Sequence, residues 1–156
     1  MEKKFKAYVI SHTHWDREWY QTFQFHRKRL VDMLDEIIDY MEANEDYTYF
    51  HFDGQTILIE DYLQIRPKNE KRLIKLIQSG RIIIGPWYVM PDEFLISGES
   101  IVRNLQRGFQ ICKKYGTEPM RNGYVVDIFG HNSQFPQILR GFDINSSVLF
   151  RGIGLH

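Results

Sequence analysis

The sequence predicts an α/β fold built around parallel strands. Short apolar runs with the composition of strands alternate with segments in which apolar residues recur at helical spacing. This alternation is typical of parallel sheets, because a crossover helix must carry the chain back before the next strand begins. Polar side chains follow several of the strand-like runs, which is where such folds place their ligand sites. The chain contains no linker, repeat or low-complexity stretch, so we expect residues 1–156 to form one domain.

The first half of the chain is expected to alternate three strands with three helices. Leu30, Leu34 and Ile37 recur on one face of the longest predicted helix. Pro67 ends the second helix, and Gly80 is a typical residue just beyond the third. In chain order, we expect a strand at 5–11, a helix at 23–44, a strand at 47–52, a helix at 57–65, a helix around 73–77 and a strand at 82–84.

The second half contains the clearest helix. This helix is predicted to start near Ser97 or Ser100 and to run to about Tyr115, with Gly116 as its stop. Ile101 lies on its apolar face. The remaining expected elements are a strand at 123–126, a short helix around 134–139 and a fifth strand at 146–150.

Composition excludes several classes of partner. The formal net charge is zero, with 20 basic and 20 acidic residues, so no electrostatic footprint for nucleic acid or an anionic membrane is present. The single cysteine, Cys112, lies in a helical pattern and is expected to be a buried, unreactive thiol. The first residues lack the apolar region of a secretory signal, and no apolar stretch reaches the roughly 20 residues of a membrane span. We therefore expect a soluble cytoplasmic protein.

A metal site is predicted where two strands end. His14 and Asp16 follow the apolar run at 7–10, and Asp127 follows the run at 123–126. Zinc accepts histidine nitrogen and carboxylate oxygen, and a catalytic zinc keeps one position open. An H-x-D spacing alone is a weak indication, which the second carboxylate and the strand context strengthen.

Other polar and aromatic residues have structural explanations. Asp53 stands beside Gly54 and is interpreted first as a turn residue. His12 and His131 are expected to support the site or to pack, rather than to bind metal. Trp87 is expected in the core, whereas for Trp19 core packing and substrate contact are evenly balanced.

Four segments resemble the N-terminal part of the α-mannosidases of glycoside hydrolase family 38. The first is His12-Thr13-His14-Trp15-Asp16-Arg17-Glu18-Trp19, an H-x-H-x-D pattern with a tryptophan three residues on. The others are residues 85–93, 100–105 and 123–131. They span almost the whole chain in the family's order, and together they are specific. The first segment is similar to that of a bacterial clade that includes mannosylglycerate hydrolases.

This resemblance implies a retaining, zinc-dependent hydrolase of terminal α-mannosides. One zinc ion would be bound by His14, Asp16 and Asp127, and Asp127 would also be the nucleophile. The mannose pocket would be lined by Trp19, Phe129 and Arg151. Cobalt or another divalent ion could replace zinc.

The resemblance also implies a fold and a missing part. The family's catalytic domain is similar to a seven-stranded β/α barrel, so this chain would form a partial barrel of about five strands. A further histidine ligand and the acid/base aspartate would lie outside it, and the chain alone should have little or no activity. An incomplete barrel would favour self-association, an irregular cap over the open edge or marginal stability. The alternatives are an inactive mannose- or metal-binding module and another metal-dependent carbohydrate enzyme, such as a deacetylase.

Overall fold

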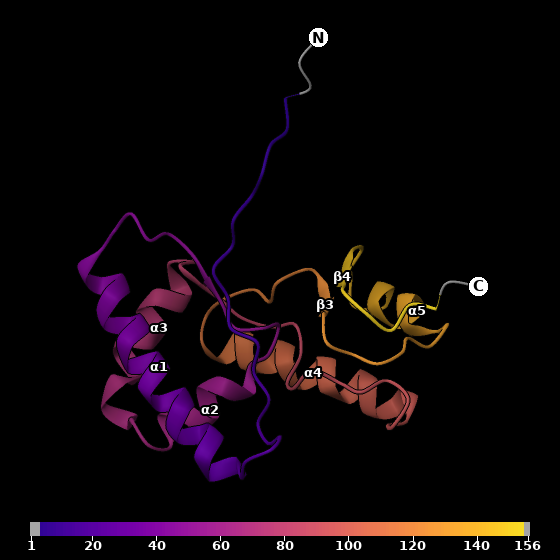
Figure 1. Ribbon diagram of the computed structural model, residues 1–156, viewed down its shortest axis with the longest axis horizontal. Helices are drawn as coiled ribbons and strands as arrows, with labels where there is room; N and C mark the ends of the chain where they lie inside the picture. The colour runs from indigo at the N-terminus through magenta and orange to yellow at the C-terminus, as the bar shows by residue number, and fades with distance from the viewer. Residues whose placement is uncertain (1–3, 155–156) are drawn as a thin grey trace.

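Helices and short strands alternate along the chain. The computed structural model describes residues 4–154, and Figure 1 shows their arrangement. The order of elements agrees with the predicted one from residue 23 onwards, although each strand is shorter than predicted. The elements are α1 (Phe23–Ala43), β1 (Phe50–His51), α2 (Ile57–Leu63), the 3-10 turn η1 (Pro67–Asn69), α3 (Glu70–Gln78), β2 (Ile82–Ile83), α4 (Gly98–Lys114), β3 (Gly123–Val125), α5 (Phe135–Arg140) and β4 (Ser147–Leu149).

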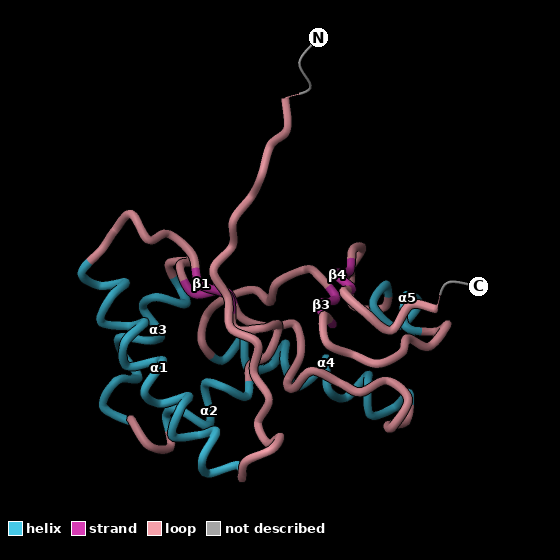
Figure 2. Tube along the Cα trace, in the orientation of Figure 1, coloured by secondary structure: helices cyan, strands magenta, loops and turns pink. Residues whose placement is uncertain are grey.

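The prediction of a partial β/α barrel is wrong. The strands form two separate parallel pairs, β1 with β2 and β3 with β4 (Figure 2). Phe50 is opposite Ile82 in the first pair, and Tyr124 is opposite Val148 in the second. No ladder joins the two pairs within residues 4–154, so no barrel closes there. With only two or three paired residues per strand, these pairs are too short to form a continuous curved sheet.

The predicted first strand, residues 5–11, is also wrong. The segment runs away from the rest of the molecule as an extended chain (Figure 1). Its apolar side chains are exposed, reaching 95% for Val9. Its contact with β1 is limited to its end, where His12 bridges His51 and His51 N–H donates to the Ser11 carbonyl. Apolar residues favour a strand only where a neighbouring strand and a covering layer are available.

The buried side chains form two hydrophobic clusters. The larger packs α1, α2 and α3 against β1 and β2, and the smaller packs Trp87, β3 and α5. Helix α4 joins them, because Ile101 and Leu105 enter the smaller cluster whereas Ile111 and Cys112 enter the larger. At Gly108 the helix touches the backbone of Pro86 so closely that a Cβ atom would lie 2.0 Å from its carbonyl oxygen.

Helix ends and the thiol follow the sequence predictions. The Ser97 hydroxyl accepts a hydrogen bond from the Ser100 N–H and caps α4. Gly80 and Gly116 both have φ +74° just beyond helices. Cys112 is fully buried, and burial raises the pKa of its thiol to about 12. None of the helices described in residues 4–154 is both long and apolar enough to cross a membrane.

Candidate active site

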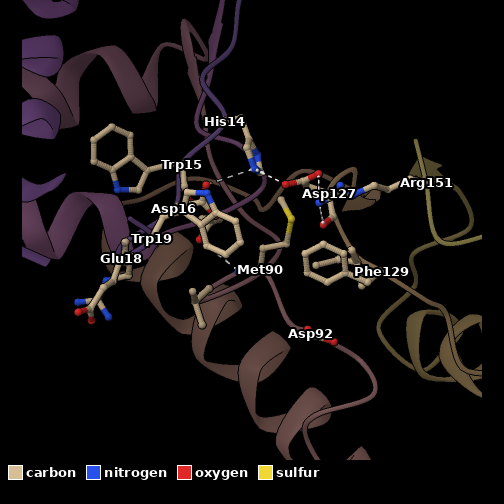
Figure 3. Close-up of a pocket in the computed structure, with 14 residues that line it drawn as sticks. His14, Trp15, Asp16, Glu18, Trp19, Met90, Asp92, Asp127, Phe129 and Arg151 are labelled. Carbon is tan, nitrogen blue, oxygen red and sulfur yellow. Dashed lines mark hydrogen bonds and ion pairs between the residues drawn. The ribbon is translucent and has the colours of Figure 1, made fainter. Parts of the chain in front are cut away.

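The six residues predicted for the site all line one pocket. The pocket has a volume of ≈ 500 Å³ (Figure 3), and both hydrophobic clusters contribute to its wall, the larger through Trp15 and Val89 and the smaller through Met90 and Ile128. Its further lining includes Glu18, Met90 and Asp92. The predicted residues on its wall are His14, Asp16, Trp19, Asp127, Phe129 and Arg151.

The pocket lies beyond the carboxyl ends of the strands. His14 follows the point where the N-terminal segment meets β1, Asp127 lies two residues after β3, and Arg151 lies two residues after β4. The segment that carries His14 is anchored from its other side, where the Arg17 guanidinium makes a two-point ion pair with buried Asp61 at 2.8 and 2.9 Å. Asp127 and Arg151 therefore follow parallel strands, as the prediction requires, whereas His14 follows an extended segment that forms no strand of its own.

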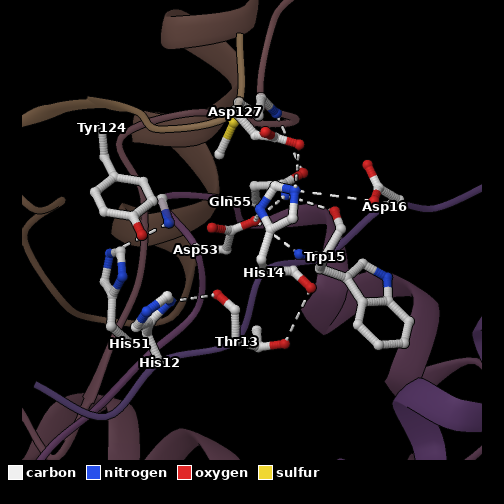
Figure 4. A network of polar contacts seen from close by, with 12 residues as sticks. His12, Thr13, His14, Trp15, Asp16, His51, Asp53, Gln55, Tyr124 and Asp127 are labelled. Atoms are coloured by element: carbon white, nitrogen blue, oxygen red, sulfur yellow. Dashed lines mark hydrogen bonds and ion pairs between the residues drawn. The ribbon is translucent and has the colours of Figure 1, made fainter. Parts of the chain in front are cut away.

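His14 is held between carboxylates on both sides of its ring. Its Nδ1 lies 3.0 Å from Asp53 Oδ2, and its Nε2 lies 3.0 Å from Asp127 Oδ2 (Figure 4). Asp16 Oδ2 is 3.8 Å from the same Nε2. One imidazole thus links the two clusters, since Asp53 follows β1 and Asp127 follows β3.

The charge of His14 is controlled by these neighbours. The hydrogen bond that His14 donates to Asp53, followed by the charges of Asp53, Asp16 and Asp127, raises the pKa of His14 from 6.5 to about 9 against the opposing effect of desolvation. The nearby His51 behaves in the opposite way, because burial lowers its pKa to about 4. At neutral pH the structure therefore holds His14 as an imidazolium and His51 as a neutral ring.

Asp127 is fixed by an arginine. Arg151 Nη2 lies 2.5 Å from Asp127 Oδ1 and also donates to the Asp127 carbonyl oxygen at 3.2 Å. The Arg151 guanidinium stacks over the Phe129 ring at 4.4 Å. One carboxylate oxygen therefore meets Arg151 and the other meets His14, so the carboxylate is held between these two side chains on the pocket wall.

Two aromatic rings are available to a ligand and a third is not. The side chains of Trp19 and Phe129 are 61% and 62% exposed and line the pocket, which removes core packing as the explanation for Trp19. Trp87 is fully buried and stacks on Phe135, as predicted for a core residue. Exposed aromatic faces are suited to the apolar faces of a pyranose.

His131 supports the site through a buried carboxylate. The Glu93 side chain is fully buried and lies 2.7 Å from His131 Nδ1, and the backbone and side-chain N–H groups of Asn132 donate to its other oxygen. His131 Nε2 lies 2.9 Å from the Arg151 carbonyl oxygen. Glu93 therefore ties the Asp127 loop to the backbone that carries Arg151, which is the supporting role predicted for His131. The His12 ring lies with Nδ1 2.9 Å from the Thr13 carbonyl oxygen.

The donor set fits zinc, although it is not arranged as a preformed metal site. No group of three or more His, Cys, Asp or Glu side chains within residues 4–154 is spaced to hold a metal ion. His14 Nε2 instead hydrogen-bonds to Asp127, while Asp16 stands 3.8 Å away. One imidazole nitrogen with two carboxylates within 3.8 Å of it is nevertheless a donor combination that zinc binds.

Sequence reasoning missed the residues behind His14. The turn beside Gly54 accounts for Asp53 in the sequence, and nothing there marks Gln55. In the structure the Gln55 amide donates to Asp53 and to the Trp15 carbonyl, and its carbonyl accepts the Met90 N–H. Asp53 and Gln55 are both essentially buried. A buried run that ends in Asp and Gln, instead of in exposed turn residues, is the only indication that the sequence offers.

A protein-family model matches nearly the whole chain. Residues 4–152 match the glycosyl hydrolases family 38 N-terminal domain. The chain is 44% identical over 147 residues to the "Putative mannosylglycerate hydrolase" of Halalkalibacterium halodurans, and 28% identical over 153 residues to alpha-mannosidase F of Dictyostelium discoideum. These alignments cover 94% of this chain in each case.

A solved structure agrees with both sequence and fold. The crystal structure of an alpha-mannosidase from Enterococcus faecalis V583 superposes with a TM-score of 0.87 at 41% identity and covers 90% of this chain. The chain spans only 16% of that structure, and 16% and 15% of the two curated relatives. On the extent of the matched domain and the identity to these relatives, the chain belongs to glycosyl hydrolase family 38.

Proposed function

We propose that this chain supplies the nucleophile and the metal-binding side chains of a retaining, zinc-dependent α-mannosidase site. The observation that carries the proposal is the position of Asp127. Its two oxygens are held by Arg151 and His14 at the mouth of a ≈ 500 Å³ pocket with exposed aromatic walls. Family membership and the mannosidase relatives support the reaction class.

The chain's own residues would divide the work of the first chemical step. Trp19 and Phe129 would stack on the sugar and place its anomeric carbon over Asp127. A carboxylate oxygen of Asp127 then forms a bond to that carbon as the glycosidic bond breaks and the leaving oxygen takes a proton from a general acid. Arg151 would keep the carboxylate oriented during the attack.

Zinc would be held by His14 through Nε2, by Asp16 and by Asp127. When bound, it would supply a Lewis acid beside the sugar hydroxyls and the developing positive charge. Other divalent ions with the same ligand preference remain compatible with this donor set.

The buried carboxylate of Glu93 is not the general acid. Glu93 cannot serve, because its carboxylate is buried and both oxygens are engaged by His131 and Asn132. The family resemblance places the acid/base and a further histidine ligand outside these residues. We therefore expect the chain alone to bind zinc and α-mannosides, with little or no turnover.

A calorimetric zinc titration tests the proposed site. The wild type and His26→Ala, a histidine outside the pocket lining, should bind one zinc ion with equal affinity. His14→Ala and Asp127→Ala should each lose the site. Zinc binding that is unchanged in both of these variants would contradict the ligand assignment.

A second measurement separates the mannosidase from the alternatives. Binding of an aryl α-mannoside but not its β-anomer, reduced by Trp19→Ala, would support the proposed substrate class. A polypeptide carrying this chain together with the remainder of a family catalytic domain should then hydrolyse it. Mannose binding without hydrolysis in that polypeptide would favour an inactive binding module, and release of acetate from an acetylated sugar would favour a deacetylase.

A further inference from the structure

Asp53 is a buried carboxylate directed at His14 from behind the pocket. Its side chain is fully buried and it is absent from the pocket wall, so it cannot meet a ligand directly. It follows β1 and has φ +53°, a conformation that Asp and Asn tolerate better than most residues. Figure 4 shows it on the side of the His14 ring opposite Asp127.

One oxygen of Asp53 collects three contacts. Oδ2 lies 3.0 Å from His14 Nδ1, 2.8 Å from the Trp15 backbone nitrogen and 3.1 Å from Gln55 Nε2. Oδ1 is buried and has no hydrogen-bond partner within the described residues. Burying a carboxylate with an unpaired oxygen is unfavourable, and such groups persist where they serve a particular role.

The turn beside Gly54 does not explain this carboxylate. A turn residue bonds to backbone groups one or two positions along the chain. Asp53 instead accepts a hydrogen bond from the N–H of Trp15, which lies 38 positions earlier in the chain. It also contacts the ring of His14, the residue before Trp15. Its contacts therefore organise the His14–Asp16 segment and not its own loop.

In the proposed metal site, these contacts would fix the orientation and the tautomer of His14. A histidine that donates Nδ1–H to a carboxylate is fixed in one tautomer and one ring orientation, with Nε2 left to face outward. In this chain Nε2 faces Asp127 at 3.0 Å and Asp16 at 3.8 Å. The hydrogen bond from the Trp15 N–H fixes the peptide group that joins His14 to Trp15, so one carboxylate oxygen holds both the ring of His14 and the backbone that leads to Asp16.

We propose that Asp53 is the positioning residue of the metal site, holding His14 so that Nε2 is the only nitrogen presented to the metal. The inference rests on the proposed function. Gln55 extends it, because its amide donates to Asp53 Oδ2 and its carbonyl accepts the Met90 N–H on the pocket wall. A displacement of Asp53 would therefore shift the pocket wall at two places, at His14 directly and at Met90 through Gln55.

Asp53→Asn is the variant that tests this role. Asparagine keeps the volume, tolerates a positive φ and still offers one oxygen, but it removes the charge that selects the His14 tautomer. The matched control is Asp143→Asn, because Asp143 is the other non-glycine residue with positive φ, at +57°, and it is exposed and outside the pocket. Losing such a supporting carboxylate is expected to weaken zinc binding by about 10- to 100-fold, whereas the control should bind like the wild type.

A spectroscopic readout separates positioning from general folding. Two-bond ¹H–¹⁵N spectra of the zinc-bound wild type should show His14 bound through Nε2 with a protonated Nδ1. Asp53→Asn should lose this single state and show mixed or broadened His14 resonances, while the other histidines remain unchanged. The wild-type spectrum does not depend on a variant, so zinc bound through Nδ1 of His14 would overturn the inference even if Asp53→Asn failed to fold.

The outcomes also distinguish this inference from the proposed function. If Asp53→Asn matches the wild type in affinity and in its His14 spectrum, the positioning role is wrong and the metal site stands. If the wild type binds no zinc, the proposed metal site is wrong and the inference fails with it. Weakened binding with a changed His14 spectrum, in Asp53→Asn alone, supports both.

Discussion

His14 is the residue at which local chemistry and overall packing meet. Its side chain is 34% exposed, yet Asp53 and Asp127 contact both ring nitrogens and raise the pKa of the imidazole to about 9. A raised pKa means that the charged ring stabilises the folded state fully below the unfolded value near 6.5. This contribution is lost as the pH rises through 9, and solvent screening reduces its size.

The same proton must leave before a metal can bind. We expect zinc affinity to increase as the pH rises from 6.5 to 8.5, approaching tenfold per pH unit, because the His14 proton competes for Nε2. Calorimetry in two buffers of different ionisation enthalpy should show release of about one proton per zinc ion at pH 7.5. A pH-independent affinity without proton release would show that His14 is already neutral in the metal-free protein. His51 should not contribute, because its pKa of about 4 keeps it neutral throughout this range.

The sequence predicted the residues of the pocket more completely than the residues behind it. His14, Asp16 and Asp127 each follow an apolar run, which marks them in the sequence, although only Asp127 follows a strand in the structure. The contact of Asp53 with Trp15 joins residues 38 positions apart, and no local pattern encodes it. The Asp53-Gly54 pair predicts a turn, and that local prediction gives no sign that Asp53 also contacts residues far away in the sequence.

Helix α4 is the element that connects the two halves of the site. It packs on the loop through Pro86 and Trp87, and Asn104 bonds to the backbone of Tyr88 and Val89 on the same loop. That loop continues to Met90 and Asp92 on the pocket wall. The close approach at Gly108 therefore fixes one wall of the pocket.

Adding a methyl group at Gly108 should disturb this contact. In Gly108→Ala the new Cβ would lie 2.0 Å from the Pro86 carbonyl oxygen, so helix and loop must separate. We expect a loss of about 1–3 kcal/mol in the free energy of unfolding, which outweighs the roughly 1 kcal/mol that alanine gains in a helix. Urea unfolding measures it, with Gly98→Ala as control because a Cβ there meets no atom within 4 Å. Equal midpoints for both variants would show that the loop yields without cost.

Helical elements could be predicted because their information is local. The apolar faces of α1 and α4 and the Ser97 cap are all visible in short stretches of sequence. The predicted strand at 5–11 failed because pairing depends on partners elsewhere in the chain. Its apolar composition is real, but no described residue provides a second strand along its length.

The whole molecule exposes apolar surface on two sides. The N-terminal segment presents Phe5, Tyr8 and Val9 at 89%, 75% and 95% exposure, and Phe150 beyond β4 is 82% exposed. An extended apolar segment with unpaired backbone groups is a template for pairing with another chain. In a barrel, a neighbouring strand would cover the N-terminal segment. The two separate strand pairs of this structure leave it exposed.

We expect the chain to self-associate through this segment. The sedimentation coefficient should rise between micromolar and millimolar concentrations, and Val9→Lys should reduce that rise by placing a charge in the contact. Ile65→Lys is the matched control, because Ile65 is an apolar residue just beyond α2 that is 46% exposed. A monodisperse monomer at all concentrations, or an equal effect of both substitutions, would contradict a role for residues 5–11.

The passage of α4 through both hydrophobic clusters has a consequence for cooperativity. Its first turns are buried with β3 and α5, and its last turns with α1 and α3. If either cluster unfolds independently, α4 loses its packing against that cluster. Asp53 and Asp127, which His14 bridges, then move apart. Amide hydrogens in the middle of α4 should therefore exchange with solvent only through the opening that also dismantles the pocket. Their protection factor would measure directly how long the site stays assembled.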